Sequence, residues 1–544
     1  MINVEINGVL KRCKKGTRVI DLIDNKEKEY VSCKVGHRVR ELTYKLNKST
    51  AVELLTLDNE ESVRIYESSL RFIFAMACKK LYPELNIRFS YHISRSIFVK
   101  ILNGGQIFTE EMLQNIKKEM LSIVSEAIPF ERETISIEEA RDLYEEYHLQ
   151  DKLELLEYRP ENTVHVYRCG WYLNYFYSYM VPSTDYLDKF NLILYEPGII
   201  LQYPRAEEKG KLPKFKEEVK YGKTLKEANI WGKTIDAETV ARINNNVRGK
   251  GLIDFIHSCE ARHNKMICEL GDRIAKNNKV KLIAIAGPTS SGKTTFSNRL
   301  RIELLTKGIK PVKLSMDDYY IDRDLIKPDE NGKVDLEDIN TIDIKLFNEH
   351  IYRLIQGEEV ELPRFDFTIG KRVRGKKVKI DKESPIIIEG IHALNEKLTS
   401  SIPGEMKFKV YISPHIQINL DNQNPISMTQ LRLVRRLVRD KMFRNSSALR
   451  TLSMWESVRQ GEFKWIYNTE EEADYVFNSE LSYELCVLKK YALPLLKKID
   501  KENEYYIEAN RLIKFLKYFI EIDESMVPCD SLLREFIGGS CFKE

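Results

Sequence analysis

The chain of 544 residues has few features that would place it outside the ordinary soluble class. No apolar run approaches the roughly 20 residues that a membrane-spanning helix needs, and the N-terminal residues lack the layout of a signal peptide. The nine cysteines include no CxxC pair, so neither a zinc knuckle nor a disulfide framework is indicated. The net charge of +4 is close to balance and gives no electrostatic argument for nucleic acid or membrane as the main partner. We expect a cytoplasmic protein with reduced thiols.

The length exceeds what one hydrophobic core supports, so several domains are expected. Strand-like apolar runs alternate with helical patterns in the C-terminal half, which predicts a three-layer α/β domain with a parallel sheet. The predicted segments are a small ubiquitin-like (β-grasp) domain at 1–60, an α+β domain at 61–230, a helical connector at 231–277, the α/β domain at 278–495 and a helical tail at 496–544.

Local patterns refine the first three segments. Ile2, Val4 and Ile6 alternate before Asn7-Gly8, which predicts the start of a hairpin, and a short capped helix is expected after Thr17. An apolar stripe predicts helix over 235–276. The mixed Lys, Glu, Pro and Gly composition of 205–230 favours a linker or surface arm.

Residues 287–294 read Gly-Pro-Thr-Ser-Ser-Gly-Lys-Thr, a complete P-loop, between an apolar strand-like run and a helical pattern. Backbone N–H groups of such a turn and the positive end of its helix converge on phosphates. We expect Lys293 to reach the β- and γ-phosphates of ATP and Thr294 to bind Mg²⁺; a chance Gly/Ser turn is the alternative. The predicted nucleotide-binding residues are Gly287, Pro288, Thr289, Ser290, Ser291, Gly292, Lys293, Thr294 and Thr295.

Two further apolar strands end in carboxylates. Asp317 and Asp318 follow the run 312–316, and Glu389 follows the run 385–388. Ligands bind at the carboxyl ends of strands in open α/β sheets, where a carboxylate can bind Mg²⁺ or accept a proton from an attacking hydroxyl. A turn for the Asp pair and a helix N-cap for Glu389 are the structural alternatives.

Arginines recur on one side of a predicted helix over 432–440. Arg432, Arg435, Arg436 and Arg439 have i, i+3, i+4, i+7 spacing, with leucines and valines between them that we expect to pack inward. Beside a P-loop, four guanidiniums on one face favour a phosphate-closing lid, because phosphoryl transfer needs its developing charge neutralised and water excluded. A solvated basic face is the alternative.

These motifs follow one another in the order GPTSSGKTT, LSMDDYY, PRFDF, IIIEGIHAL and RLVRRLVRD. In that order they resemble the uridine–cytidine kinase and phosphoribulokinase family, and the resemblance covers about 278–495. It implies a kinase that uses ATP and Mg²⁺ and transfers the γ-phosphate to a hydroxyl group. In the uridine kinase branch the acceptor is the 5′-hydroxyl of a nucleoside, with uridine and cytidine as the first candidates.

The resemblance also implies roles for matching positions. Asp317 looks like the general base for the 5′-hydroxyl, acting with Lys293, and Thr294, Asp317 and Glu389 would surround Mg²⁺. Arg439 and Arg444 match arginines that face the phosphates. The positions matched to the acceptor site are Tyr320, Glu337, Phe365, Phe367 and Arg436, of which Glu337 stands where the family has a ribose-binding Asp.

Several positions depart from the family pattern. The His of its uracil pocket is Gly370 here, the Tyr of its PxYDF motif is Phe365, and a base-contacting lid Gln is Met454. A second lid Arg is Ser446. Hydrogen-bonding sites discriminate strongly between substrates, and a site without these groups does not. We therefore expect ATP-dependent phosphorylation with weak selection of the base.

The N-terminal half carries a second resemblance, to threonyl-tRNA synthetases. Residues 1–60 resemble their TGS domain, and 66–204 resemble their editing module through the helix at 68–83 and the run Val181-Pro182-Ser183-Thr184. The four metal-ligand-type positions of that module are Ser68, Phe72, Phe176 and Met180, so no zinc site or deacylase chemistry can be built from them. We expect a filled pocket in a scaffold, binding surface or sensor. The aromatic residues at 166–190 suit core packing better than RNA stacking.

Three hypotheses follow. The first is a nucleoside kinase that acts on a small-molecule acceptor. The second is a nucleotide-switched regulator whose synthetase-like half binds RNA or another effector. The third keeps the kinase and makes the front half a regulatory or oligomerisation module, which would allow a homo-oligomer.

Overall fold

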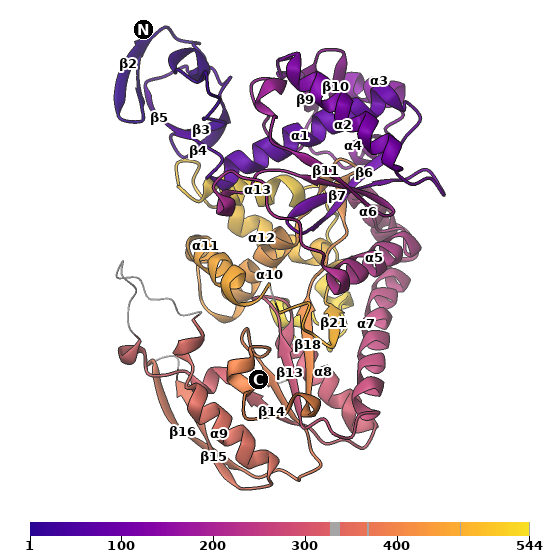
Figure 1. Cartoon of the computed structure of the whole chain (residues 1–544), viewed down its shortest axis with the longest axis vertical. Helices are drawn as coiled ribbons and strands as arrows, with labels where there is room; N and C mark the ends of the chain where they lie inside the picture. The colour runs from indigo at the N-terminus through magenta and orange to yellow at the C-terminus, as the bar shows by residue number, and fades with distance from the viewer. Residues whose placement is uncertain (327–337, 367–368, 468, 543–544) are drawn as a thin grey trace.

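The computed structural model describes residues 1–326, 338–366, 369–467 and 469–542 (Figure 1). Its N-terminal part is a five-stranded sheet of order β2-β1-β5-β3-β4 in which β1 and β5 are parallel neighbours. The predicted hairpin is present: Asn7 and Gly8 have φ of 45° and 83°, as two-residue turns between twisted strands require. The predicted helix is only a 3₁₀ turn over Val19–Leu22. The strands are β1 (Ile2–Ile6), β2 (Val9–Cys13), β3 (Ser32–Val35), β4 (Arg38–Glu41) and β5 (Thr50–Leu55).

The next region packs the long helix α1 against two small antiparallel sheets, β11-β12-β7-β6 and β10-β9-β8. Asn59 caps α1, because its side chain accepts a hydrogen bond from the Glu61 amide. The elements are α1 (Glu60–Leu81), β6 (Ile87–Ile93), β7 (Ser96–Ile101), α2 (Glu110–Ser125), β8 (Glu131–Ser136), α3 (Ile137–Glu146), α4 (Gln150–Leu156), β9 (Thr163–Cys169), β10 (Tyr172–Asn174), β11 (Asn191–Tyr195) and β12 (Gly198–Gln202).

The aromatic residues of this region form its core. Phe72 is buried, and its ring centroid lies 5.4 Å from that of Phe130, 5.0 Å from that of Tyr172 and 5.3 Å from that of Phe176. Met180 is buried in the same cluster. Three of the four positions that the resemblance matched to metal-ligand-type residues, Phe72, Phe176 and Met180, are therefore apolar side chains packed in a core.

The connection to the α/β domain differs from the expected linker and single helix. Val219–Thr234 form helix α5, whose first amides, on Lys220 and Tyr221, donate to the Glu471 carboxylate. Helices α6 (Val240–Arg248) and α7 (Leu252–Ala275) follow, separated at residues 249–251, where two glycines interrupt the helical pattern. The charged sequence of 205–230 concealed the buried face of α5, because that face carries only a few apolar residues.

The predicted parallel α/β sheet is confirmed, with strand order β14-β17-β13-β18-β21 and every neighbouring pair parallel. Strand β13 is central and buried along its whole length, which suits the sequence LIAIA. Helices α7 and α8 (Lys293–Thr306) cover one face and α9 (Ile344–Ile355) the other. The strands are β13 (Leu282–Ala286), β14 (Val312–Ser315), β17 (Ile386–Glu389), β18 (Lys407–Ser413) and β21 (Tyr475–Asn478), and the hairpin β15 (Val360–Asp366) and β16 (Lys371–Val378) lies beside the sheet.

The C-terminal helices join the two halves rather than trailing from the chain. Figure 1 shows α10 to α13 between the sheet and the N-terminal elements. Lys152 of α4 forms a buried ion pair with Asp421 at 3.1 Å, and Arg511 of α13 pairs with Glu61. The elements are β19 (Asn419–Asp421), β20 (Asn424–Pro425), α10 (Met428–Phe443), α11 (Ala448–Trp465), α12 (Glu484–Lys497), α13 (Tyr506–Leu516) and α14 (Arg534–Ile537). None of the helices in the described part of the chain is long and apolar enough to cross a membrane.

Candidate active site

The P-loop forms the turn between β13 and α8. Gly287 must be glycine, because a Cβ there would lie 2.0 Å from the carbonyl oxygen of Ile412 in β18. Ser290 and Gly292 have positive φ, 59° and 93°, which closes the loop tightly before α8 begins. Lys293 curls back over the loop and donates from Nζ to the carbonyls of Gly287 at 2.9 Å and Pro288 at 3.0 Å. Its ammonium group therefore lies where phosphates of a bound nucleotide would lie.

The predicted carboxylates meet at the same edge of the sheet as the P-loop. β14, β17 and β13 are adjacent parallel strands, so Asp317, Glu389 and Lys293 converge at their carboxyl ends. Asp317 keeps some exposed surface, but many protein atoms surround its carboxylate. This desolvation raises the pKa of Asp317 to about 6; the Glu389 carboxylate also raises it, and Lys293 lowers it. A carboxylate with such a pKa can accept a proton near neutral pH.

The predicted metal ligands form an all-oxygen set. Thr294 Oγ1 donates to Glu389 Oε2 at 3.3 Å, and the other Glu389 oxygen pairs with Lys313 Nζ at 3.0 Å. The Glu389 carboxylate is close enough to Asp317 for its charge to raise the pKa of Asp317. Mg²⁺ prefers one or two carboxylates together with phosphate and water oxygens, so these residues fit it. They would hold Mg²⁺, which shields the charge of ATP phosphates during transfer.

The predicted acceptor residues Tyr320 and Phe365 lie in the segment after β14 and in β15. The rings of Tyr320 and Phe365 meet edge to face at 5.7 Å, and the Asp318 carboxylate accepts a hydrogen bond from the Phe365 amide at 3.2 Å. The two aspartates therefore have different surroundings. Asp318 hydrogen bonds to the β15–β16 hairpin, whereas Asp317 lies close to Lys293 and Glu389. The predicted acceptor residues Glu337 and Phe367 lie outside the described residues.

The arginine helix α10 corrects the prediction of one basic lid face. Arg432 and Arg435 are fully buried and paired with Glu462 and Glu484 respectively. Instead of facing phosphates, they donate to P-loop carbonyls: Arg432 Nε to Thr289 at 3.0 Å, and Arg435 Nη1 to Ser290 at 3.3 Å. These two arginines hold the loop in place.

The remaining arginines of this segment are Arg436 and Arg439, farther along α10, and Arg444, just after its end. Arg436 and Arg439 both hydrogen bond to Asp440, at 3.3 Å and 2.9 Å. The side chain of Arg444 is 60% exposed and lies 3.8 Å from the same carboxylate. Burial lowers the pKa of Lys293, and the positive charge of Arg439 lowers it further. Burial raises the pKa of Asp317, and the positive charge of Arg444 opposes this. The two residues predicted to face phosphates are thus near the P-loop and the proposed base.

We expect Glu462→Gln to destabilise the fold. Removing one partner of a buried ion pair leaves an uncompensated charge and costs about 3 kcal/mol or more, and Arg432 has no exposed surface through which water could replace the carboxylate. Thermal unfolding should show a clearly lower Tm. Glu456→Gln, an exposed change on the same helix, is the control. Equal Tm values for both variants would show that the buried Arg432–Glu462 ion pair does not stabilise the fold.

Sequence reasoning missed three residues that contact the site. Lys313 orients Glu389, Glu462 accepts from the Thr289 amide at 3.3 Å, and Glu535 accepts from the Thr295 amide at 3.0 Å. Lys313 could have been found as a cation in β14, the strand that precedes Asp317. No local signal marks Glu462 or Glu535, because each reaches the loop from a helix far along the chain.

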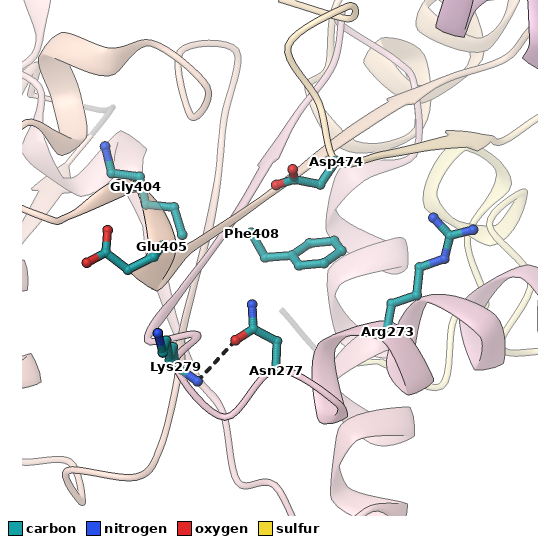
Figure 2. A pocket seen from close by; sticks show the side chains of 8 residues that line it. Arg273, Asn277, Lys279, Gly404, Glu405, Phe408 and Asp474 are labelled. Carbon is teal, nitrogen blue, oxygen red and sulfur yellow. Dashed lines mark hydrogen bonds between the residues drawn. The ribbon is translucent and has the colours of Figure 1, made fainter.

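Two hollows lie away from the P-loop. Figure 2 shows one of about 550 Å³, lined by residues before β13 and β21 and at the start of β18, including Lys279, Phe408 and Asp474. These residues lie at the amino ends of the strands, opposite the P-loop. The other, of about 880 Å³, lies between α5, α7 and the edge strand β21. Neither contains a predicted site residue.

Comparison with known proteins agrees with both resemblances. Residues 282–482 match the model of the Phosphoribulokinase / Uridine kinase family. Threonine–tRNA ligase of Clostridium kluyveri is 32% identical to this chain over 190 residues, which are 34% of this chain and 30% of the ligase. The match lies in the N-terminal half. The chain therefore spans about a third of the length of the ligases that it resembles.

The solved structures with partial similarity to this chain include two kinases. "A Possible Uridine Kinase" from Bacillus stearothermophilus is 18% identical with a TM-score of 0.28, covering 39% of this chain and 98% of that chain. D-glycerate 3-kinase from Cryptococcus neoformans is 17% identical with a TM-score of 0.20, covering 51% of this chain and 88% of that chain.

Proposed function

We propose that residues 282–482, which form a domain of the phosphoribulokinase/uridine kinase family, transfer the γ-phosphate of ATP to the 5′-hydroxyl of a nucleoside. The observation that carries this proposal is the convergence of Lys293, Asp317 and Glu389 at the carboxyl ends of three adjacent parallel strands. Such a set combines a phosphate cradle, a proton acceptor and a metal ligand, which are the parts that phosphoryl transfer needs.

In this mechanism each residue has one task. Asp317 accepts the proton of the attacking hydroxyl, and its raised pKa of about 6 suits that task. Lys293 leaves the carbonyls of Gly287 and Pro288 and neutralises charge on the phosphates. Arg439 and Arg444 lie close enough to assist it.

We propose uridine and cytidine as the first acceptors to test, with weak discrimination between bases. Tyr320 and Phe365 offer aromatic surface. The positions of three base-contacting residues carry Phe365, Gly370 and an exposed Met454. Gly370 has φ of 68° in the turn between β15 and β16, and a Cβ there would lie 2.7 Å from the Arg323 side chain, so a side chain at this position would be strained and would require Arg323 to move.

The test is phosphate transfer from ATP to a panel of nucleosides, with ribulose 5-phosphate and D-glycerate as non-nucleoside acceptors. We expect transfer to pyrimidine nucleosides with kcat/KM values that differ by less than about tenfold between bases, since apolar contacts discriminate weakly. Transfer to a non-nucleoside acceptor alone would refute the nucleoside assignment and keep the kinase.

We also propose that the N-terminal half binds or regulates rather than hydrolyses. The observation in support is that Phe72, Phe176 and Met180 are packed in its core at the positions where the resembling module has polar ligands. Its helices and the β19–β20 hairpin are joined by the buried Lys152–Asp421 pair, which gives this half a rigid connection to the kinase domain.

A further inference from the structure

Helix α14, close to the C-terminus, lies directly on the P-loop. The Glu535 carboxylate accepts a hydrogen bond from the Thr295 amide in the first turn of α8 at 3.0 Å. On the other side of Lys293, a Cβ at Gly292 would lie 3.2 Å from Leu532 Cδ2. The segment 528–542, here named the C-terminal strap, therefore contacts the loop on both sides of its lysine.

The amide that Glu535 occupies is one that a nucleotide needs. The loop amides and the first helical turn of a P-loop hold the α- and β-phosphates of the nucleotide. A carboxylate, like a phosphate, is an anion whose oxygens accept hydrogen bonds, so the Glu535 carboxylate can occupy the amide that a phosphate oxygen would otherwise use. Desolvation raises the pKa of the Glu535 carboxyl, and the hydrogen bond from Thr295 lowers it. The charge of Glu389 raises this pKa, and the charges of Arg439 and Lys293 lower it. These groups are those that a bound triphosphate would meet.

The strap is a built structure. Leu533, Phe536 and Ile537 are buried in the core that includes α10 and α12. The Arg435 guanidinium lies over the Phe536 ring at 5.0 Å. The Cys541 amide donates to the Cys529 carbonyl at 3.0 Å and closes the strap into a loop with α14 inside it. Glu535 is therefore held against α8 by its surroundings.

We propose that the C-terminal strap is autoinhibitory: it places Glu535 in the nucleotide site, and ATP binds only when this carboxylate leaves the Thr295 amide. Displacement frees that amide for phosphate and leaves Lys293 and Arg439 without the competing charge of Glu535. The strap thereby sets the ATP concentration at which the kinase becomes active. The proposal concerns nucleotide binding and goes beyond the choice of acceptor.

The test compares Glu535→Gln and Glu535→Ala with the wild-type full chain under reducing conditions. Glu521→Gln is the matched control, since it removes the same charge from an exposed position before the strap. Calorimetric titration with a non-hydrolysable ATP analogue and Mg²⁺ should give a Kd about tenfold lower for Glu535→Ala, which removes both the charge and the acceptor of the Thr295 amide. Glu535→Gln keeps a carbonyl oxygen for that amide and loses only the charge, so its Kd should fall by less, and Glu521→Gln should have the wild-type Kd. Hydrogen exchange of peptides covering 531–538 in the wild type should become faster when the analogue binds.

Two results would overturn the proposal. One is an unchanged Kd in both Glu535 variants, including the case in which none of the proteins binds the analogue. The other is exchange in 531–538 that stays the same or slows on binding, since Glu535 would then remain in place and contact the nucleotide. Intact analogue binding with no transfer to any nucleoside would instead refute only the acceptor assignment.

Discussion

Asp317→Asn should lower kcat by a factor of about 10² to 10⁴ while ATP affinity changes little, because a positioned general base contributes that much to proton transfer. The amide has nearly the shape of the carboxylate and cannot accept the hydroxyl proton. Asp317 follows β14, close to Glu389 and Lys293, and the cations Lys293 and Arg444 lower its pKa against the larger effect of desolvation. Initial rates at saturating ATP and acceptor, with ATP affinity from calorimetry, measure the two effects separately.

The neighbouring acid provides the control. Asp318→Asn keeps a carbonyl oxygen that can accept from the Phe365 amide, so the hairpin should hold and kcat should stay within a few-fold of wild type. The pair tests whether the chemistry depends on one carboxylate or on the local negative charge. A kcat near wild type in Asp317→Asn, or equal losses in both variants, would remove Asp317 from the role of base.

The parts of the site that could be predicted are those fixed by local sequence and strand direction. The P-loop is contiguous, and the carboxyl ends of parallel strands must meet at one edge, so Asp317 and Glu389 followed from their positions after apolar runs. Spacing on α10 placed its four arginines on one side. It could not show that Arg432 is paired with Glu462, because the partner comes from the next helix along the chain.

Glu535 was beyond prediction for the same physical reason. It lies 240 residues from Thr295, and its contact depends on how the C-terminal helices fold back onto the kinase domain. The expected helical tail contained no signal for this, since α14 is a single turn. α5 was missed because a charged composition says which residues face water and not whether the remaining face is covered. Long-range contacts of this kind require the packed chain.

The core formed by α10, α12 and α13 connects the N-terminal half of the chain with the C-terminal strap. It contains residues from α4 and α6 as well as from α14, so one continuous packed cluster extends from the synthetase-like half to the strap on the P-loop. Close-packed interiors transmit displacement poorly by bending and well by switching between packings. The N-terminal half and the strap therefore belong to one packed unit, and a change in packing at one end of this core can reach the other end.

Lys293→Met should lower kcat by about two to three orders of magnitude, since a preorganised cation at developing phosphate charge contributes roughly that much. ATP affinity should fall less, because the loop amides remain. The resting structure adds a second effect: Nζ holds the carbonyls of Gly287 and Pro288, and the methionine leaves both without this donor. Single-turnover rates at saturating ATP separate loss of transfer from loss of binding.

The matched control is Lys307→Met, just after the C-terminal end of α8. Lys307 pairs with Asp272 and Glu303 on the surface and lies outside the site, so Lys307→Met removes the same charge and keeps an unbranched apolar side chain, without touching the P-loop. Its kcat should equal that of wild type. A double-mutant cycle with Glu535→Gln adds a further expectation: the two substitutions should be non-additive in ATP affinity, because Glu535 and Lys293 interact in the resting state. Wild-type kcat in Lys293→Met would exclude this lysine from phosphate transfer, and strict additivity would place Glu535 outside its influence.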